Sequence, residues 1–269
     1  MRREPRVKAR RESDDMQIRM IDTHCHLEQK EFRQDLNIVL QRAERMGIVC
    51  ITSAIAPEEW EICLKTATHY ENVFASIGLD PMLWQQTERL ISFIEAHQEE
   101  IIAIGEVGLD YYRERDHSNR TAQIESLQRI VQLSKELQLP IQIHSRSAGK
   151  QALDVLSKTQ ASFVQMHAFD GKASYAREAS RELDFYFSIP TSVVRSPQKQ
   201  KLVKAVKIDR LLIETDSPVL GPDSEKRNDP TNLPIVINEV SRILRMDSEE
   251  LREKVLENTI RLYPKISIR

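Results

Sequence analysis

Short apolar runs alternate along the chain with longer segments in which apolar residues recur at helical spacing. The runs have the length of buried strands, and none approaches the roughly 20 residues that a membrane-spanning helix requires. This alternation is typical of a parallel sheet in which a helix connects each strand to the next. The predicted strands are residues 17–24, 48–54, 73–78, 101–106, 140–145, 163–168, 185–190 and 210–215.

Helical spacing is clearest in residues 121–139, where apolar side chains recur three or four positions apart. The stretch after the eighth strand has room for a loop and more than one helix. No linker-like or low-complexity segment divides the chain. Eight strands separated by helix-sized segments therefore predict an α/β fold, a single-domain (β/α)8 TIM barrel formed by residues 17–269.

Residues 1–16 differ from the rest because they are rich in arginine and have no apolar periodicity. We expect a disordered basic tail. A basic arm that touches phosphate is one alternative. The other is an N-terminal extension or misassigned start, because Met16 and Met20 lie just before the first motif.

Composition narrows the class of protein. The formal net charge of -2 argues against a broad basic surface that coats nucleic acid, although a local basic site is still compatible with it. The three cysteines have no C-x-x-C spacing, which favours buried free thiols over a disulfide framework or a cysteine zinc site. Together with the lack of a signal-peptide core, these features predict a cytoplasmic protein with no membrane association, and we expect a monomer.

Histidines and carboxylates lie at the C-terminal ends of five predicted strands. Within THCH, His24 and His26 are two positions apart, so in a strand both imidazoles point to the same face, opposite Thr23 and Cys25. An isolated H-x-H pair is more often structural, but the C-terminal ends of barrel strands share one mouth, where catalytic groups gather. The sequence therefore predicts a metal site there. Its candidate ligands are His24, His26, Glu106, His144, His167, Glu214 and Asp216.

The number of ligands indicates two metal ions. Four histidines with Glu106 and Asp216 exceed what one open catalytic zinc site usually provides. A carboxylate can bridge two ions, and such pairs activate water while neutralising a phosphoryl oxygen. Imidazole and carboxylate ligands suit zinc, manganese, cobalt or iron, and magnesium is less natural at a histidine-rich site.

A series of short motifs runs in order through residues 20–264. They are DTHCHL, IGEVGLDYY, PIQIHSRSAG, VQMHAFDG, IETDSPVLGP, RNDPTNLP and ENTIRLYP. In content and order this series resembles the TatD-type metal-dependent deoxyribonucleases of the amidohydrolase-like superfamily. The HAFDG, SIPTSVVRSPQKQKLVK and ETDSPVLGP stretches are most similar to the third animal TatD-domain paralogue.

The resemblance implies a role for each candidate ligand. His24, His26 and Asp216 would hold one metal ion, His144 and His167 would hold the second, and Glu106 would bridge them. The family pattern also implies that Asp216 orients or deprotonates the attacking water.

Three further residues match family positions near the substrate. Arg146, in HSR, would grip phosphate as a bidentate donor, with a surface ion pair as the alternative. Asn228, in RNDP, would lie at the rim of the site, and Arg227 would be a further phosphate contact. An ordinary loop role is the alternative for both.

Asp80 departs from the family pattern. Where the family often reads G-x-H-P after the third strand, this chain reads GLDP, so a carboxylate replaces a histidine that lines the site. A negative Asp80 beside the metals should repel phosphate unless it is protonated or binds a metal. A loop cap before Pro81 is the alternative.

The expected function is hydrolysis of DNA phosphodiester bonds, as a 3′-5′ exonuclease or repair-type deoxyribonuclease that uses water activated by two metals. The resemblance supplies DNA as the substrate and leaves RNA open. The enzyme alternative is D-aminoacyl-tRNA deacylation, or another ester or amide hydrolysis, in which Asp80 could hold a substrate ammonium. A non-catalytic binding barrel is the third option, but the filled ligand positions argue against it.

Overall fold

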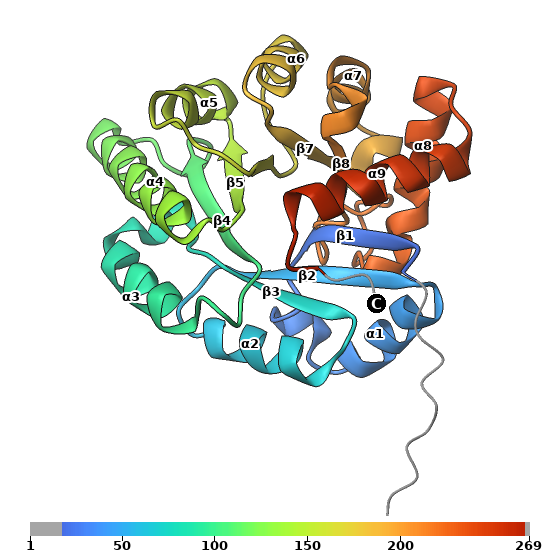
Figure 1. Cartoon of the computed structure of the whole chain (residues 1–269), viewed down its shortest axis with the longest axis horizontal. Coiled ribbons are helices and arrows are strands. Elements are labelled where there is room, and N and C mark those ends of the chain that lie inside the picture. Colours follow the sequence, from blue (N-terminus) through green and yellow to red (C-terminus); the bar gives the residue numbers. More distant parts are fainter. Residues whose placement is uncertain (1–17, 267–269) are drawn as a thin grey trace, which may run out of the picture.

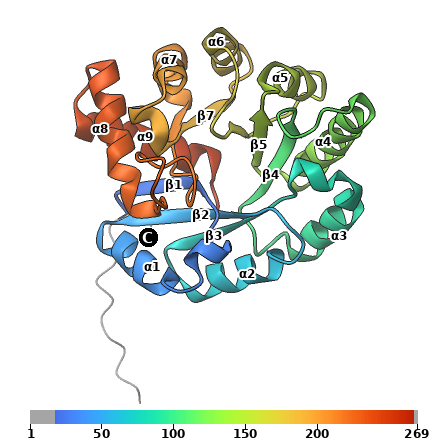
Figure 2. The ribbon, with the colours of Figure 1, turned by 180° about the vertical axis from the view of Figure 1, so that it is seen from behind.

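The computed structural model describes residues 18–266, so the tail predicted for residues 1–16 lies outside the described residues. Eight strands pair in parallel in the order of the sequence, from β1 to β8. Figure 1 shows the helices arranged around these strands, and Figure 2 shows the same ring from behind. The predicted (β/α)8 TIM barrel is confirmed. Among residues 18–266, no helix combines the length and apolar character needed to cross a membrane.

Each predicted strand corresponds to an observed one. The strands are β1 (Met20–Cys25), β2 (Ile48–Ala54), β3 (Val73–Ile77), β4 (Ala103–Asp110), β5 (Ile141–Arg146), β6 (Val164–Met166), β7 (Tyr186–Ile189) and β8 (Leu211–Ile213). The largest difference is in β4, which continues through the GLD that follows Glu106. Glycines usually weaken a strand. Gly108 fits here because it lies opposite His144 of β5, where the two backbones approach so closely that a side chain would clash.

Helices follow the strands and form the outer wall. The α-helices are α1 (Leu36–Arg45), α2 (Trp60–His69), α3 (Thr87–His97), α4 (His117–Leu137), α5 (Gly149–Lys158), α6 (Ala173–Glu182), α7 (Pro197–Ala205), α8 (Leu233–Leu244) and α9 (Ser248–Leu262). The short 3-10 helices are η1 (Lys30–Phe32), η2 (Pro81–Gln86), η3 (Thr191–Val194), η4 (Ile208–Arg210) and η5 (Pro230–Asn232). The predicted helix at 121–139 is the larger part of α4. The two helices expected after the eighth strand are α8 and α9.

The barrel closes differently between β8 and β1 than between the other strands. Within residues 18–266 no β8–β1 ladder forms, and hydrogen bonds from the segment after β8 take its place. These bonds are Asp216 N–H to the His24 carbonyl (2.9 Å), His26 N–H to the Ser217 carbonyl (2.8 Å) and Thr215 N–H to the Asp22 carboxylate (2.8 Å). The seam therefore holds two predicted ligands, His24 and Asp216, in register.

The segment that follows α9 packs into the barrel at the end opposite the candidate ligands. Tyr263 follows α9 and packs with Ile21, Ala103 and Leu212 near the N-terminal ends of the strands. Its buried hydroxyl donates to Gln165 and accepts from Gln142 Nε2 at 3.1 Å. This buried polar layer separates the apolar floor from the mouth of the barrel.

Candidate metal centre

All the predicted metal ligands meet at the C-terminal mouth of the barrel. His26, Glu106, His144, His167 and Asp216 line a cleft of about 260 Å³, and His24 lies beneath it, fully buried. Strand alternation brings the β1 pair to this face, as expected. A bulge in β1 between Asp22 and Cys25 also turns Thr23 inward, where its hydroxyl accepts from Gln165 Nε2 at 3.0 Å. The expectation that Thr23 faces away with Cys25 is therefore wrong.

Glu106 lies between two sets of imidazoles. Its Oε2 is 3.1 Å from His24 Nε2 and 3.3 Å from His26 Nε2. Its Oε1 is 3.2 Å from His167 Nε2 and also contacts His144 Nδ1. Each carboxylate oxygen therefore faces a different pair of histidines, which is the arrangement that a bridging ligand requires.

The spacing of these atoms fits metal coordination. Asp216 Oδ1 completes the first set at 3.4 Å from His26 Nε2 and 3.8 Å from His24 Nε2. In the second set, His144 Nδ1 is 3.4 Å from His167 Nε2. Tetrahedral ligands at the usual zinc bond length lie about 3.3 Å apart, so both sets have suitable separations. The donor groups His24–His26–Asp216 and His24–Glu106–His167 are also compact enough to hold an ion.

The outward nitrogens of three histidines are fixed by hydrogen bonds. His24 Nδ1–H donates to Gln142 Oε1 at 3.0 Å, and His26 Nδ1–H donates to the Ser53 carbonyl at 2.7 Å. His144 Nε2–H donates to Asp110 Oδ2 at 3.2 Å. Such bonds set the tautomer, so each remaining nitrogen presents a lone pair to the site.

Charge complementarity within the centre is strong. Burial alone would raise the pKa of Glu106, but the charges of His167 and His144 and their hydrogen bonds lower it well below its usual value. Burial alone would lower the pKa of His144, but the Glu106 charge and the bonds to Asp110 and Glu106 raise it to about 8. Without a metal ion, protons on His144 and His167 would balance Glu106, and a divalent cation would compete with them for the same nitrogens.

Glu214, the remaining carboxylate candidate, lies behind the ligands. It is fully buried, and its Oε1 accepts from the Ala168 N–H at 2.8 Å. The same oxygen is 3.7 Å from His167 Nδ1. Glu214 therefore supports the segment that carries His167.

Asp80 lines the cleft, but its charge is paired. Both carboxylate oxygens accept from Arg113, at 2.9 and 2.7 Å, and Oδ1 also accepts from the Met82 N–H at 2.8 Å. Asp80 is thus the loop cap considered above and an ion-pair partner as well. The pairing with Arg113 offsets the repulsion of phosphate that the sequence alone suggested.

Arg146 is the arginine of the cleft that is free to bind an anion. No carboxylate lies within ion-pair distance of it in the part of the chain that the structure describes. Its guanidinium stacks on Tyr112, with Cζ 3.9 Å from the ring centroid. Tyr112 is 52% exposed, so an arginine and an aromatic face lie together at the mouth.

Arg227 and Asn228 contact the protein rather than the cleft. Arg227 makes a bidentate pair with Asp35, at 2.8 and 2.7 Å. Asn228 is fully buried, and its Nδ2 donates to the Thr215 carbonyl at 2.8 Å and the Val219 carbonyl at 2.9 Å. These contacts fit the loop role given above as the alternative, since Asn228 organises the segment that carries Asp216.

Two functional neighbours were missed in the sequence although a signal for them exists. Asp110 lies four positions after Glu106 in the same strand, and Gln142 lies two positions before His144. Strand alternation puts each on the face of its ligand. The predicted fourth strand ends at Glu106, whereas β4 continues to Asp110, so the prediction left Asp110 outside the strand.

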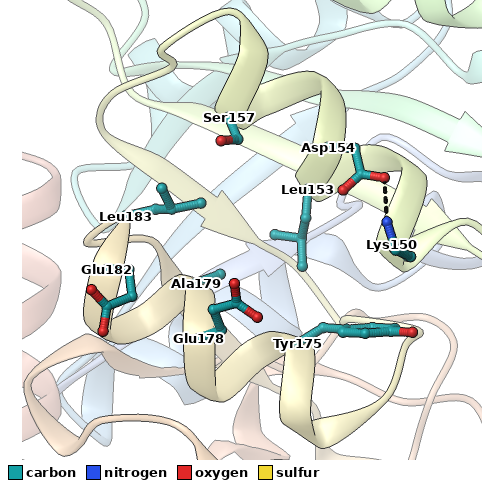
Figure 3. A pocket seen from close by; sticks show the side chains of 9 residues that line it. All are labelled: Lys150, Leu153, Asp154, Ser157, Tyr175, Glu178, Ala179, Glu182 and Leu183. Carbon is teal, nitrogen blue, oxygen red and sulfur yellow. Dashed lines mark hydrogen bonds and ion pairs between the residues drawn. The ribbon is translucent and has the colours of Figure 1, made fainter.

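A hollow of similar volume lies on the outer wall of the barrel. A cavity of about 270 Å³ between α5 and α6 is lined by Leu153, Tyr175 and Ala179 and edged by the Lys150–Asp154 ion pair (Figure 3). Its lining contains no histidine or cysteine. This hollow therefore lacks the histidine ligands that a metal site of the kind at the mouth requires.

Comparisons with known proteins agree with this geometry. A family model described as TatD related DNase matches residues 21–264. The putative deoxyribonuclease TATDN3 of Mus musculus is 37% identical over 268 residues, which is 93% of this chain and 90% of the mouse protein. The metal-dependent hydrolase YabD of Bacillus subtilis is 33% identical over 256 residues, or 91% of this chain and 98% of YabD.

A solved structure matches as well. The TatD homologue YJJV of Escherichia coli K12 superposes with a TM-score of 0.84 at 26% identity, over 93% of this chain and 99% of that chain. The resemblance predicted from the motifs, including the similarity to the third animal paralogue, is confirmed.

Proposed function

The chain belongs to the TatD-related deoxyribonuclease family and is a metal-dependent hydrolase of this type, and we propose that it removes nucleotides from the 3′ end of DNA with two divalent ions. The observation that carries the proposal is the position of Glu106, whose two oxygens face two separate histidine pairs. Zinc, manganese or cobalt suits these ligands, and magnesium less so.

Two ions bound at such a site supply activation of water and neutralisation of charge at phosphorus. The residues of the chain then have distinct tasks. Asp216 turns Oδ1 toward His26 at 3.4 Å, which leaves Oδ2 to orient the attacking water and accept its proton. Arg146 holds a nonbridging phosphate oxygen, and Tyr112 offers a face for a base.

The size and charge of the site favour a strand end. The cleft is small, about 260 Å³, and the formal net charge of -2 argues against a broad basic surface. A duplex-coating protein would need many phosphate contacts. A terminal nucleotide needs few, which suits an exonuclease.

No specific observation favours the deacylase alternative. That alternative used Asp80 to hold a substrate ammonium, but Arg113 occupies both oxygens of Asp80. We further propose that the protein is a monomer. We also propose that it works in a reducing compartment such as the cytoplasm, because Cys25, Cys50 and Cys63 are free and buried.

The test uses single-stranded DNA labelled at its 5′ end, with manganese, cobalt, zinc or magnesium and with a chelator control. We expect a ladder of products that shorten from the 3′ end, and no products with chelator or with His144→Ala. A parallel substrate blocked at its 3′ end should stay intact. Intact DNA under every metal, with protein shown to be metal-loaded, would refute the nuclease proposal.

We expect Arg146→Ala to weaken substrate binding more than turnover. Losing a charge-assisted bond to phosphate should raise KM about 10- to 100-fold while kcat changes less. Steady-state kinetics on short single-stranded DNA would measure both constants. Arg146→Lys should be intermediate because lysine cannot form the bidentate contact.

The control for this experiment is Arg242→Ala on α8, an arginine paired with Glu239 away from the cleft. It should keep the wild-type KM. If Arg146→Ala also keeps it, Arg146 has no role in phosphate binding.

A further inference from the structure

One guanidinium joins the loops that follow β3 and β4. Arg113 Nε–H donates to Asp110 Oδ2 at 2.7 Å, while Nη1 and Nη2 donate to the two oxygens of Asp80 at 2.9 and 2.7 Å. Asp80 is itself anchored by the Met82 N–H at the start of η2. We call these three residues the Asp80–Arg113–Asp110 chain.

The Asp80–Arg113–Asp110 chain ends on His144, a candidate metal ligand. Asp110 Oδ2 accepts from both Arg113 Nε and His144 Nε2, the latter at 3.2 Å. Asp110 Oδ1 accepts from the backbone N–H groups of Tyr112 and Arg113, at 3.1 and 2.9 Å. Both oxygens are therefore committed, and the side chain of Asp110 is almost fully buried.

The orientation of His144 depends on this arrangement. Its Nδ1 contacts Glu106 Oε1, whereas Nε2 contacts Asp110. Rotating the ring by half a turn would exchange nitrogen and carbon positions and remove both contacts. His144 is also the least buried of the four histidines, so surrounding packing restrains it least.

Asp80 has a separate effect on Arg113. The Arg113 side chain is 40% exposed and lines the cleft, where an unrestrained guanidinium could reach a substrate phosphate. The bidentate pair with Asp80 holds it against Asp110 instead. Arg113 thus supports a ligand, whereas Arg146 is left for the substrate.

We propose that the Asp80–Arg113–Asp110 chain is a positioning unit that orients His144 toward the second metal ion, the ion shared by Glu106, His144 and His167. The inference rests on the two-ion function proposed above. None of the three residues reaches the first set of ligands, so their loss should affect one of the two ions selectively.

The experiment measures metal binding without DNA. Metal-free protein is titrated with cobalt or manganese in a calorimeter, and bound metal is counted after dialysis. The wild type should bind two ions in two steps. Asp110→Asn and Arg113→Ala should weaken one step about 10- to 100-fold and leave the other unchanged.

Graded variants sharpen the result. Asp80→Asn should cause a smaller loss, because Arg113 keeps its bond to Asp110. Arg113→Lys keeps the positive charge but loses the bidentate guanidinium, and it should recover part of the metal affinity. This variant also provides a test if Arg113→Ala does not fold. Arg242→Ala removes an equally bidentate pair on α8 and should bind both ions as the wild type does.

The outcomes separate this inference from the function on which it rests. Two wild-type steps that stay unchanged in Asp110→Asn and in the Arg113 variants would overturn the positioning role alone. Equal weakening of both steps would also overturn it, because it would indicate general destabilisation. A wild type that binds only one ion would overturn the two-ion function and the positioning role together.

Discussion

Replacing Glu106 with glutamine is expected to reduce kcat on DNA by about three orders of magnitude and to remove one of the two metal ions proposed above. The amide has the shape of the carboxylate but only one acceptor oxygen. One end of the amide would therefore present N–H groups to a pair of imidazoles whose nitrogens already contact the native carboxylate oxygens. Turnover and metal content of the same preparation would be measured together.

Glu28→Gln provides the matched control. Glu28 is also a buried glutamate near β1, and its Oε2 accepts from the Thr52 hydroxyl at 2.7 Å. Burial raises the pKa of Glu28, whereas the charges and hydrogen bonds of His167 and His144 lower the pKa of Glu106. Glu28→Gln should retain both ions, and two ions with wild-type turnover in Glu106→Gln would rule out the bridging role.

Alanine at Gly108 is expected to destabilise the barrel by more than about 4 kcal/mol, or to prevent folding. Gly108 has a φ of 151°, and a Cβ there would lie 2.0 Å from the carbonyl oxygen of His144. The obstacle is the backbone of β5, which cannot move without displacing a ligand. Urea denaturation followed by circular dichroism would give the free energy of unfolding.

Gly221→Ala is the comparison for this variant. A Cβ at Gly221 would first meet the Asp223 carbonyl oxygen at 3.2 Å, in a loop outside the sheet. We expect a loss of about 1 kcal/mol there. A Gly108→Ala protein that unfolds at the wild-type urea concentration would show that β4 and β5 can separate at this point.

The sequence allowed the barrel, and the gathering of the candidate ligands at its mouth, to be predicted because both depend on local pattern. Apolar runs locate the strands, and a residue at the end of a run, such as His144 or Asp216, must lie at the mouth once the barrel is assumed. The choice of ligand atoms could not be predicted in this way. That His144 turns Nδ1 toward Glu106 follows from the position of Asp110, on a neighbouring strand.

Ion pairs between loops were the least predictable feature. Asp80 and Arg113 are 33 positions apart, and nothing local to either residue indicates the other. Considered alone, Asp80 is a negative charge beside the metals, and Arg227 is a cation near a family motif. Their partners, Arg113 and Asp35, become apparent only when the loops are placed together in space.

The seam between β8 and β1 makes the site a late product of protein synthesis. His24 and His26 leave the ribosome early, whereas Asp216 and the hydrogen bonds that hold it against β1 come from the far end of the barrel. The floor residue Tyr263 emerges later still, and its hydroxyl reaches Gln142, the partner of His24. A nascent chain therefore carries the first candidate ligands for most of its translation without the completed site, which forms only when the barrel closes.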